Sequence, residues 1–125
     1  MREFALSFGK WNFFTFGEVW QDDDEATIAE YIGRDTNIDD VGIVGFDAAL
    51  DFPTRKRLET VCKAVAPPAL LAQKMVTRLA AEKDVLSSHG DVGAYLVTFL
   101  ENHDLTYRYA VACRSAQVTL ALTCL

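Results

Sequence analysis

Carboxylates crowd one third of this 125-residue chain, and carboxylate oxygens at such density bind either a cation or a basic surface of another molecule. Eleven of the eighteen acidic residues lie between Glu18 and Asp51, and Arg34 is the one base among them, so this acidic window carries a net charge of −10. The other residues include eleven bases and seven acids. Because like charges repel, stability alone gives a fold little reason to collect them, and we expect a binding site here.

The candidate partner-binding residues are one aromatic side chain and the carboxylates that follow it: Trp20, Asp22, Asp23, Asp24, Glu25, Glu30, Asp35, Asp39 and Asp40. Trp20 lies among polar residues, and an exposed tryptophan ringed by carboxylates is typical of a protein-binding hot spot. Alternatively, Trp20 packs onto the next helix as a hydrophobic staple. Helix capping explains most of Asp22 to Glu25, because carboxylates favour the positive end of a helix dipole. It does not explain Glu30 and the acids after it.

The segment from Asp35 to Phe46 partly matches a calcium-binding EF-hand loop. Asp35, Asn37 and Asp39 stand at positions one, three and five of that pattern. Asp40 stands where the sharp turn needs glycine, and Phe46 stands where a bidentate glutamate closes the loop. These two departures argue against an EF-hand, so we expect no metal and no cofactor, and a divalent-cation-binding domain stays as an alternative.

No set of residues forms a catalytic pattern, and we expect that the chain is not an enzyme. Ser87, His89 and Asp91 share one loop, whereas the members of a catalytic triad usually meet through the fold. His89 and His103 have no partner at metal-ligand spacing. The basic run Arg55–Arg57 would suit a phosphate, but we favour pairing with the acidic window.

Length and composition predict one domain, residues 1–125, with a substantial core, because half of the residues are hydrophobic. The first residues lack the apolar run and cleavage site of a signal peptide, and no apolar stretch reaches the length of a membrane span. We therefore expect a cytoplasmic protein whose three cysteines are free thiols. A pI near 4.8 argues against direct nucleic-acid binding and against the membrane surface, since both are polyanions.

Apolar periodicity predicts the elements that position these residues. Alternation at Phe4, Leu6 and Phe8 favours a strand, followed either by a hairpin turn at residues 9–10 or by continuation as one long strand to Phe16. Residues 23–32 favour a helix with its N-cap at Asp22, and residues 41–46 favour a short strand.

Two further helices and a sheet follow. Asp51 and Pro53 open one helix, and a second helix begins at Pro68. The apolar stripe expected on that second helix consists of Leu71, Met75, Leu79 and Leu86. Three strands are expected at residues 94–100, 105–113 and 117–124.

The order of these elements predicts an α+β domain. Its mostly antiparallel sheet combines the N-terminal strand or hairpin with the C-terminal three-strand meander, and about three helices pack on it. The last strand would lie on an open sheet edge, through which a homodimer could form.

The leading functional hypothesis is a small acidic protein that binds a basic protein partner. Its concrete form is an immunity or inhibitor protein whose acidic face blocks a basic effector such as a toxin nuclease, because complementary charge steers the encounter. The alternative is a chaperone or adaptor for a secreted or phage protein that binds through a sheet edge or the aromatic N-terminal segment. Exposed aromatic surface would favour this alternative over the charge-led hypothesis.

Overall fold

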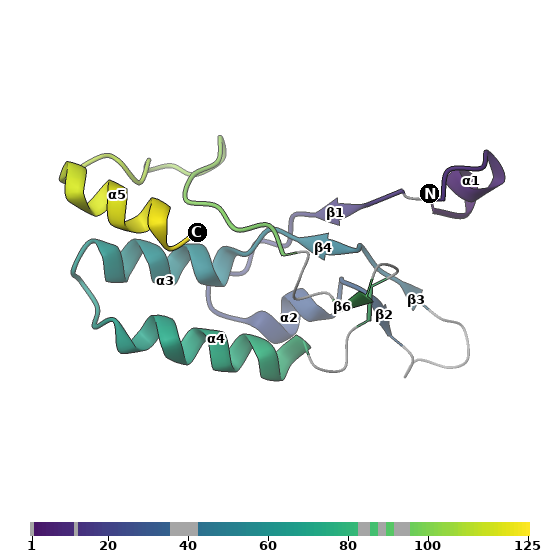
Figure 1. The fold of residues 1–125 in the computed structure, drawn as a ribbon, viewed down its shortest axis with the longest axis horizontal. Helices are drawn as coiled ribbons and strands as arrows, with labels where there is room; N and C mark the ends of the chain where they lie inside the picture. Colours follow the sequence, from purple (N-terminus) through teal and green to yellow (C-terminus); the bar gives the residue numbers. More distant parts are fainter. Residues whose placement is uncertain (1, 12, 36–42, 83–85, 88–89, 92–95) are drawn as a thin grey trace.

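A computed structural model describes residues 2–11, 13–35, 43–82, 86–87, 90–91 and 96–125. The helices in these residues are α1 (Arg2–Ser7), α2 (Glu25–Ala29), α3 (Phe52–Cys62), α4 (Ala69–Glu82) and α5 (Ser115–Thr123). The strands are β1 (Phe16–Gly17), β2 (Arg34–Asp35), β3 (Ile43–Val44), β4 (Ala48–Ala49), β5 (Leu86–Ser87) and β6 (Gly90–Asp91). The helices α3, α4 and α5 lie at one end of the molecule, and α1 lies at the other (Figure 1).

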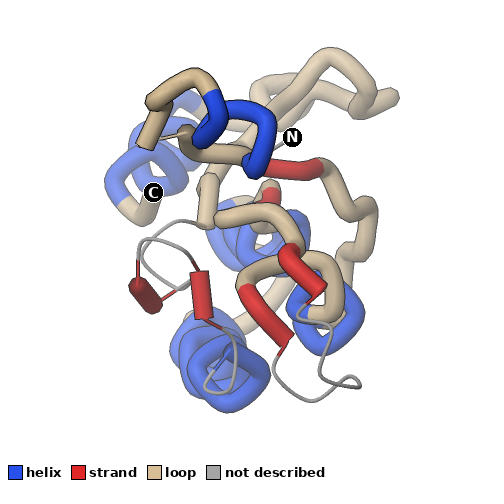
Figure 2. Tube along the Cα trace, turned by 90° about the vertical axis from the view of Figure 1, so that its right-hand side faces the viewer, coloured by secondary structure: helices blue, strands red, loops and turns tan. Residues whose placement is uncertain are grey.

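The strands form two small sheets. β1 and β4 pair in parallel, with Phe16 opposite Ala48. The other four strands pair antiparallel in the order β3-β2-β5-β6. All six strands are two residues long, so the helices rather than a broad sheet make up most of the regular structure. Viewed from the side, the strands lie around the ends of the helices (Figure 2).

The segment from Phe46 to Asp51 joins the separate parts of the chain through its backbone. On one side, Asp47 N–H donates to Thr15 O at 2.9 Å and Leu50 N–H donates to Gly17 O at 3.0 Å. On the other side, Phe46 O accepts from Gly33 N–H at 2.7 Å, and Asp51 N–H donates to Val97 O at 3.0 Å. This central segment therefore fixes three stretches of chain that are far apart in sequence.

A buried carboxylate strengthens one side of the central segment. Asp47 is fully buried, and its Oδ2 accepts hydrogen bonds from Thr15 N–H at 2.7 Å and from Thr15 Oγ1 at 2.9 Å. Hydrogen bonds to a charged group are stronger than neutral ones, and a buried carboxylate without partners would be costly. Thr15 and Asp47 therefore anchor the N-terminal segment to the body of the fold.

The core consists of two clusters. The larger lies between α3, α5 and the loop before α5, and its buried members are Leu58, Cys62, Leu100, Tyr109 and Ala121. The smaller lies around α2 and β4, and its buried members are Ile28, Ile32 and Ala49. Burial of such side chains is worth about 1.5–3 kcal/mol each, so these clusters hold the helices together.

The sequence predicted the start of α3 correctly but the inward face of α4 incorrectly. Asp51 caps α3 by accepting from Thr54 N–H at 3.0 Å, as expected. On α4, however, Leu79 is 69 % exposed, Met75 is also exposed, and Lys74 is the buried residue. Of the predicted stripe, Leu71 packs against the larger core cluster, whereas Leu86 lies in β5 and outside α4. The rest of the stripe is exposed because a distant carboxylate on α2 pairs with Lys74 and turns that side of α4 inward.

The predicted fold, a mostly antiparallel sheet with a C-terminal meander, is wrong. Residues 115–123 form α5, and residues 105–113 form a loop in which Ala112 adopts a left-handed conformation with φ of 61°. The β-branched residues of α5 suggested a strand, but their hydroxyls bond the helix itself, as Thr119 Oγ1 does to Ser115 O at 3.1 Å. The open C-terminal edge expected for a homodimer is therefore not formed.

The predicted N-terminal strand is also wrong, because residues 2–7 form a helix. Phe4 and Phe8 suit both periodicities, and in the structure their rings meet one helical turn apart, with centroids at 4.9 Å and ring planes tilted by 58°. Gly9 then turns the chain with φ of 68°, a conformation that glycine adopts without strain. The only regular strand in the described part of this segment is β1.

Asp47→Ala should lower the free energy of unfolding by about 3 kcal/mol, because it leaves the partly buried N–H and hydroxyl of Thr15 without this acceptor. Asp47→Asn, which keeps one acceptor oxygen, should cost less. Glu30→Ala is the matched control, since its side chain is exposed at the end of α2, and it should change stability by no more than ~0.5 kcal/mol. Urea denaturation measures all three. Equal losses for Asp47→Ala and Glu30→Ala would contradict the anchoring role of Asp47.

Candidate functional site

Six aromatic side chains near the N-terminus are exposed, and we name this segment the aromatic arm. Its members are Phe4, Phe8, Trp11, Phe13, Phe14 and Phe16. Their exposed fractions lie between 39 % for Phe13 and 78 % for Trp11. Single exposed apolar residues are common on protein surfaces, but contiguous ones mark interaction sites. The aromatic arm is therefore the strongest candidate for a binding surface in the described residues.

The aromatic arm is attached to the body mainly at its C-terminal end. The hydrogen bonds of Thr15 to Asp47 hold it there, and α1 extends away from α3, α4 and α5 (Figure 1). The turn that follows α1 folds back on the helix, because Lys10 N–H donates to Ala5 O at 3.0 Å. None of the rings of the aromatic arm belongs to either of the two core clusters.

The backbone of β1 lies at the C-terminal end of the aromatic arm and has one edge that faces away from β4. In the sheet of β1 and β4, Thr15 O and Gly17 O accept from the segment that contains β4. Because alternate residues of a strand direct their backbone groups to opposite sides, Phe16 N–H and C=O point away from β4. An edge with this arrangement can pair with an extended segment of a partner.

Trp20 is half-exposed, and its other face packs on the core. Its ring lies 4.8 Å from the ring of Phe52, and Phe52 meets Phe99 edge-on at 5.1 Å. Trp20 is 49 % exposed, so it offers one ring face for contact while the stack holds its position. It follows β1 closely in the chain, which places it after the aromatic arm.

Most of the acids from Asp22 to Glu25 have partners within the fold. Asp24, not Asp22, caps α2, and it accepts from Ala26 N–H at 3.0 Å and from Thr27 N–H at 3.2 Å. Asp23 pairs with Arg57 at 3.4 Å, and Glu25 pairs with the buried Lys74. This part of the acidic window is therefore committed largely to holding α2 against α3 and α4.

The later acids of the predicted site fall partly outside the described residues. Glu30 is exposed at the C-terminal end of α2. The backbone of Asp35 lies in β2, whereas Asp39, Asp40 and most of the calcium-like loop lie outside the described residues. Within the ranges that the structure describes, no three histidine, cysteine or acidic side chains come together as metal ligands.

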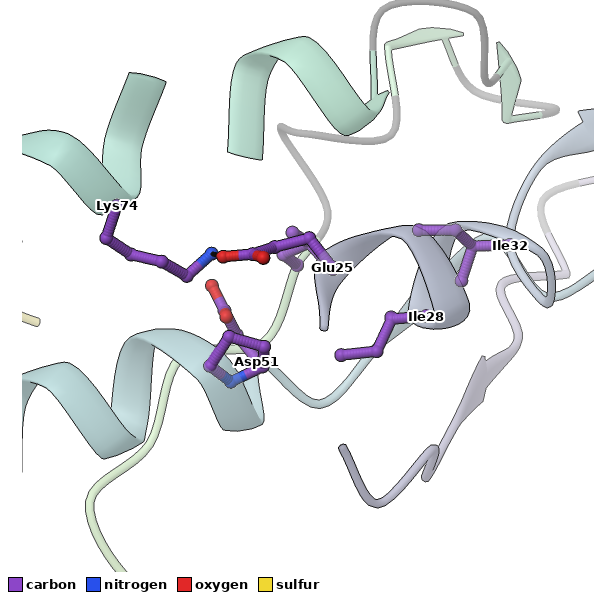
Figure 3. A pocket seen from close by; sticks show the side chains of 7 residues that line it. Glu25, Ile28, Ile32, Asp51 and Lys74 are labelled. Atoms are coloured by element: carbon purple, nitrogen blue, oxygen red, sulfur yellow. Dashed lines mark ion pairs between the residues drawn. The ribbon is translucent and has the colours of Figure 1, made fainter. Parts of the chain in front are cut away.

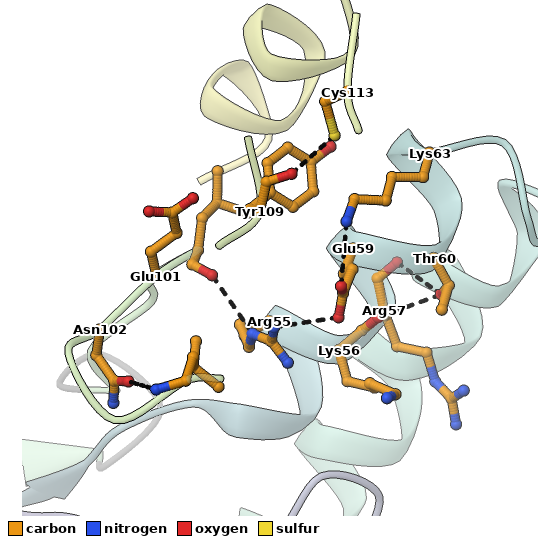
Figure 4. A network of polar contacts seen from close by, with 12 residues as sticks. Arg55, Lys56, Arg57, Glu59, Thr60, Lys63, Glu101, Asn102, Tyr109 and Cys113 are labelled. Atoms are coloured by element: carbon orange, nitrogen blue, oxygen red, sulfur yellow. Dashed lines mark hydrogen bonds and ion pairs between the residues drawn. The ribbon is translucent and has the colours of Figure 1, made fainter. Parts of the chain in front are cut away.

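The side chains of Arg55 and Arg57, in the basic run at the start of α3, point in different directions. Arg57 reaches the acidic window, as expected, through its ion pair with Asp23. Arg55 is buried instead, where it pairs with Glu59 at 3.1 Å and donates to Leu100 O at 3.4 Å (Figure 4). Arg55 therefore joins α3 to the loop before α5 and is not available to a phosphate.

A small cavity with a mixed polar and apolar lining lies between α2, α3 and α4 (Figure 3). Glu25, Asp51 and Lys74 line it together with apolar side chains, and Asp51 also pairs with Arg78 at 3.1 Å. Its volume is about 10 Å³, enough for roughly one water molecule. Small-molecule sites measure roughly 300–1,000 Å³, so this cavity is part of a structural ion-pair network.

None of the residues of the aromatic arm is among the predicted partner-binding residues, and the aromatic N-terminal segment was expected to bind only under the chaperone or adaptor alternative. Phe4 and Phe8 were assigned to a half-buried strand, and Phe13 to a hairpin or to the continuation of that strand. Two features of the sequence could have indicated exposed aromatic side chains. The first is the density of aromatic residues in this short segment, and the second is that a strand through Phe13 and Phe14 would be apolar on both faces.

Lys74→Met should lower the free energy of unfolding by about 3 kcal/mol, because it leaves the carboxylate of Glu25 in a largely buried site without its cation. The double variant Glu25→Leu with Lys74→Met removes both charges and should recover at least half of that loss. Arg57→Met is the matched control, since its ion pair with Asp23 is exposed and should contribute less than ~1 kcal/mol. Chemical denaturation of the three variants tests this, and a double variant no more stable than Lys74→Met would contradict it.

Asp24 should make stability fall in acid. The hydroxyl and then the N–H of Thr27 bond to its carboxylate and lower the pKa of Asp24. A lowered pKa in the folded state adds stability above the unfolded value, and this stability is lost as the pH falls through the folded value. Wild type should therefore melt above Asp24→Asn at pH 6, and the gap should narrow as the pH falls below about 4, the ordinary pKa of an aspartate. A gap independent of pH, measured by thermal melts across this range, would refute the assignment.

No protein family, curated protein or solved structure matches this chain. None of the helices in the described ranges is long and apolar enough to cross a membrane. The described residues thus present an arm of exposed aromatic side chains, an open strand edge and a set of carboxylates of which several are already paired.

Proposed function

We propose that this chain is a protein-binding protein of the adaptor or chaperone type, which docks on another polypeptide through the aromatic arm. The observation that carries the proposal is the exposure of six large aromatic side chains between Phe4 and Phe16. Burying an aromatic side chain is worth roughly 1.5–3 kcal/mol, so leaving six exposed forgoes on the order of 10 kcal/mol. A partner that covers these rings would recover that free energy.

The chemistry of the surface indicates the kind of partner. Aromatic side chains dominate protein-binding hot spots, and the open edge of β1 suits an extended, apolar segment of a partner. Glu18 follows β1 and is exposed, and Asp23 is also exposed nearby in sequence. We therefore propose a partner segment that is apolar where it meets the rings and basic beside them, because complementary charge speeds association.

An immunity or inhibitor protein for a basic effector is the second candidate. The exposed carboxylates favour this candidate. Glu30 is the main example, because it is exposed and forms no ion pair within the described residues. Here charge would determine binding, and the aromatic arm would contribute little. A matched pair of variants separates the two candidates, since the rings and the acids can be changed independently.

The arm variant carries Phe8→Ser, Trp11→Ser and Phe13→Ser, and should fold normally because all three side chains are exposed. The acid variant carries Asp23→Asn, Asp24→Asn and Glu30→Gln, in which asparagine still caps α2. Affinity capture of the partner from the native cell lysate compares them with wild type. The arm variant should capture at least about tenfold less partner, because each hot-spot aromatic contributes 2 kcal/mol or more. The acid variant should capture within about twofold of wild type at 0.3 M salt, where surface charges are screened.

A control variant with Val76→Ser and Leu79→Ser removes exposed apolar area from α4, away from the aromatic arm, and should capture like wild type. The reverse result, in which the acid variant loses the partner and the arm variant keeps it, would favour the inhibitor candidate. If all variants capture equally, neither surface binds the partner.

A further inference from the structure

Helix α4 directs charged side chains toward the rest of the protein and apolar side chains toward solvent. Lys74 is 4 % exposed, and both Lys74 and Arg78 form ion pairs with carboxylates outside α4. On the opposite side of the helix, Val76 is 68 % exposed and Leu79 is 69 % exposed. An amphipathic surface helix normally places its apolar side against the core, so this arrangement is reversed. Contiguous exposed apolar side chains mark an interaction surface.

The exposed apolar residues of α4 share one side of the helix. They are Ala72, Met75, Val76, Leu79 and Ala80, and we name them the α4 face. Residues three and four places apart lie above one another on a helix, so the five side chains are contiguous. The α4 face contains no charged side chain. α4 packs on α2 and α3 with its other side and lies at the edge of the molecule (Figure 1).

We propose that the α4 face docks on the α4 face of a second copy of this chain, with the two helices antiparallel about a two-fold axis. An axis between Met75 and Val76 sets Ala72 of each copy against Leu79 of the other copy. Large and small side chains then alternate across the contact, and the same surface serves both copies. The order of residues along the α4 face is therefore complementary to itself.

Charge favours a second copy at this face. The whole chain carries a net charge of −6, so two copies that meet through acidic surfaces repel each other. In a two-fold interface each surface meets its own duplicate, and any net charge on it is opposed by the same charge. The α4 face avoids this repulsion, because its five residues are uncharged.

The size of the α4 face predicts a weak dimer. The helix from residue 72 to residue 80 is about 12 Å long and about 10 Å wide. It offers less than the roughly 800 Å² that each partner contributes to a standard interface, so we expect a dissociation constant on the order of 0.1 mM. This dimer is independent of the docking role proposed for the aromatic arm, because α1 lies at the other end of the molecule (Figure 1).

Sedimentation velocity of the full chain, from ~10 µM to ~1 mM, tests the proposal. Wild type should shift from monomer to mostly dimer over this range. The double variant Val76→Gln with Leu79→Gln should associate at least about tenfold more weakly, because the dimer loses four apolar side chains. The matched control, Leu120→Gln with Leu122→Gln, changes two exposed leucines of α5 and should dimerise like wild type. Circular dichroism checks that both variants are folded.

Two charge variants test the antiparallel register. Ala72→Glu and Leu79→Lys should each weaken self-association, because each sets a charge against an apolar residue of the second copy. A mixture of the two variants should associate severalfold more tightly than either alone, since the introduced carboxylate then meets the introduced ammonium. Three results would overturn the proposal: wild type that stays monomeric at ~1 mM, equal association of the two glutamine variants, or a mixture that associates no better than its components. The first would assign the α4 face to a different protein.

Discussion

The hydrogen bonds of the central segment, Phe46 to Asp51, hold the parts of this small fold in register. Asp47 accepts from the N–H and hydroxyl of Thr15, Phe46 O accepts from Gly33 N–H, and Asp51 N–H donates to Val97 O. Each of these contacts joins stretches that are distant in sequence. With only two-residue strands in the described ranges, the fold cannot rely on long sheet ladders, and the buried Asp47 compensates with charge-assisted hydrogen bonds.

The same anchor explains why the aromatic arm is exposed. Thr15 and β1 fix the C-terminal end of the arm to the body, and residues 2–7 fold locally into α1. In contrast to the aromatic rings, the carboxylates of Glu25 and Asp51 lie inside the fold, because they form ion pairs with Lys74 and Arg78. The chain thus buries part of its acidic window and exposes aromatic rings, which is the reverse of what stability alone would favour.

Local signals predicted part of this structure, and distant contacts determined the rest. Asp51 and Pro53 specify the start of α3 by themselves, so the sequence predicted it correctly. The cap of α2 was misplaced by two residues because consecutive acids offer several equivalent caps. The inward turn of Lys74 requires Glu25 from another helix, and the helical state of residues 115–123 requires Ala121 to pack on α3. For the candidate site, Trp20 was expected to be exposed and is half-exposed. The aromatic residues before it were placed in a half-buried strand or hairpin, because periodicity alone does not show which face is covered, and their exposure was expected only under the chaperone or adaptor alternative.

The most direct test of the central claim is the solvent accessibility of Trp11 before and after binding. Trp20→Phe leaves Trp11 as the only tryptophan, since the chain has two, and acrylamide quenching of its fluorescence then reports on the aromatic arm alone. In the isolated chain, Trp11 should be quenched almost as strongly as free tryptophan. In the complex captured from the native lysate, its quenching should fall severalfold and its emission should shift to the blue. Equal quenching of Trp11 in the free and bound chain would contradict the docking role of the aromatic arm.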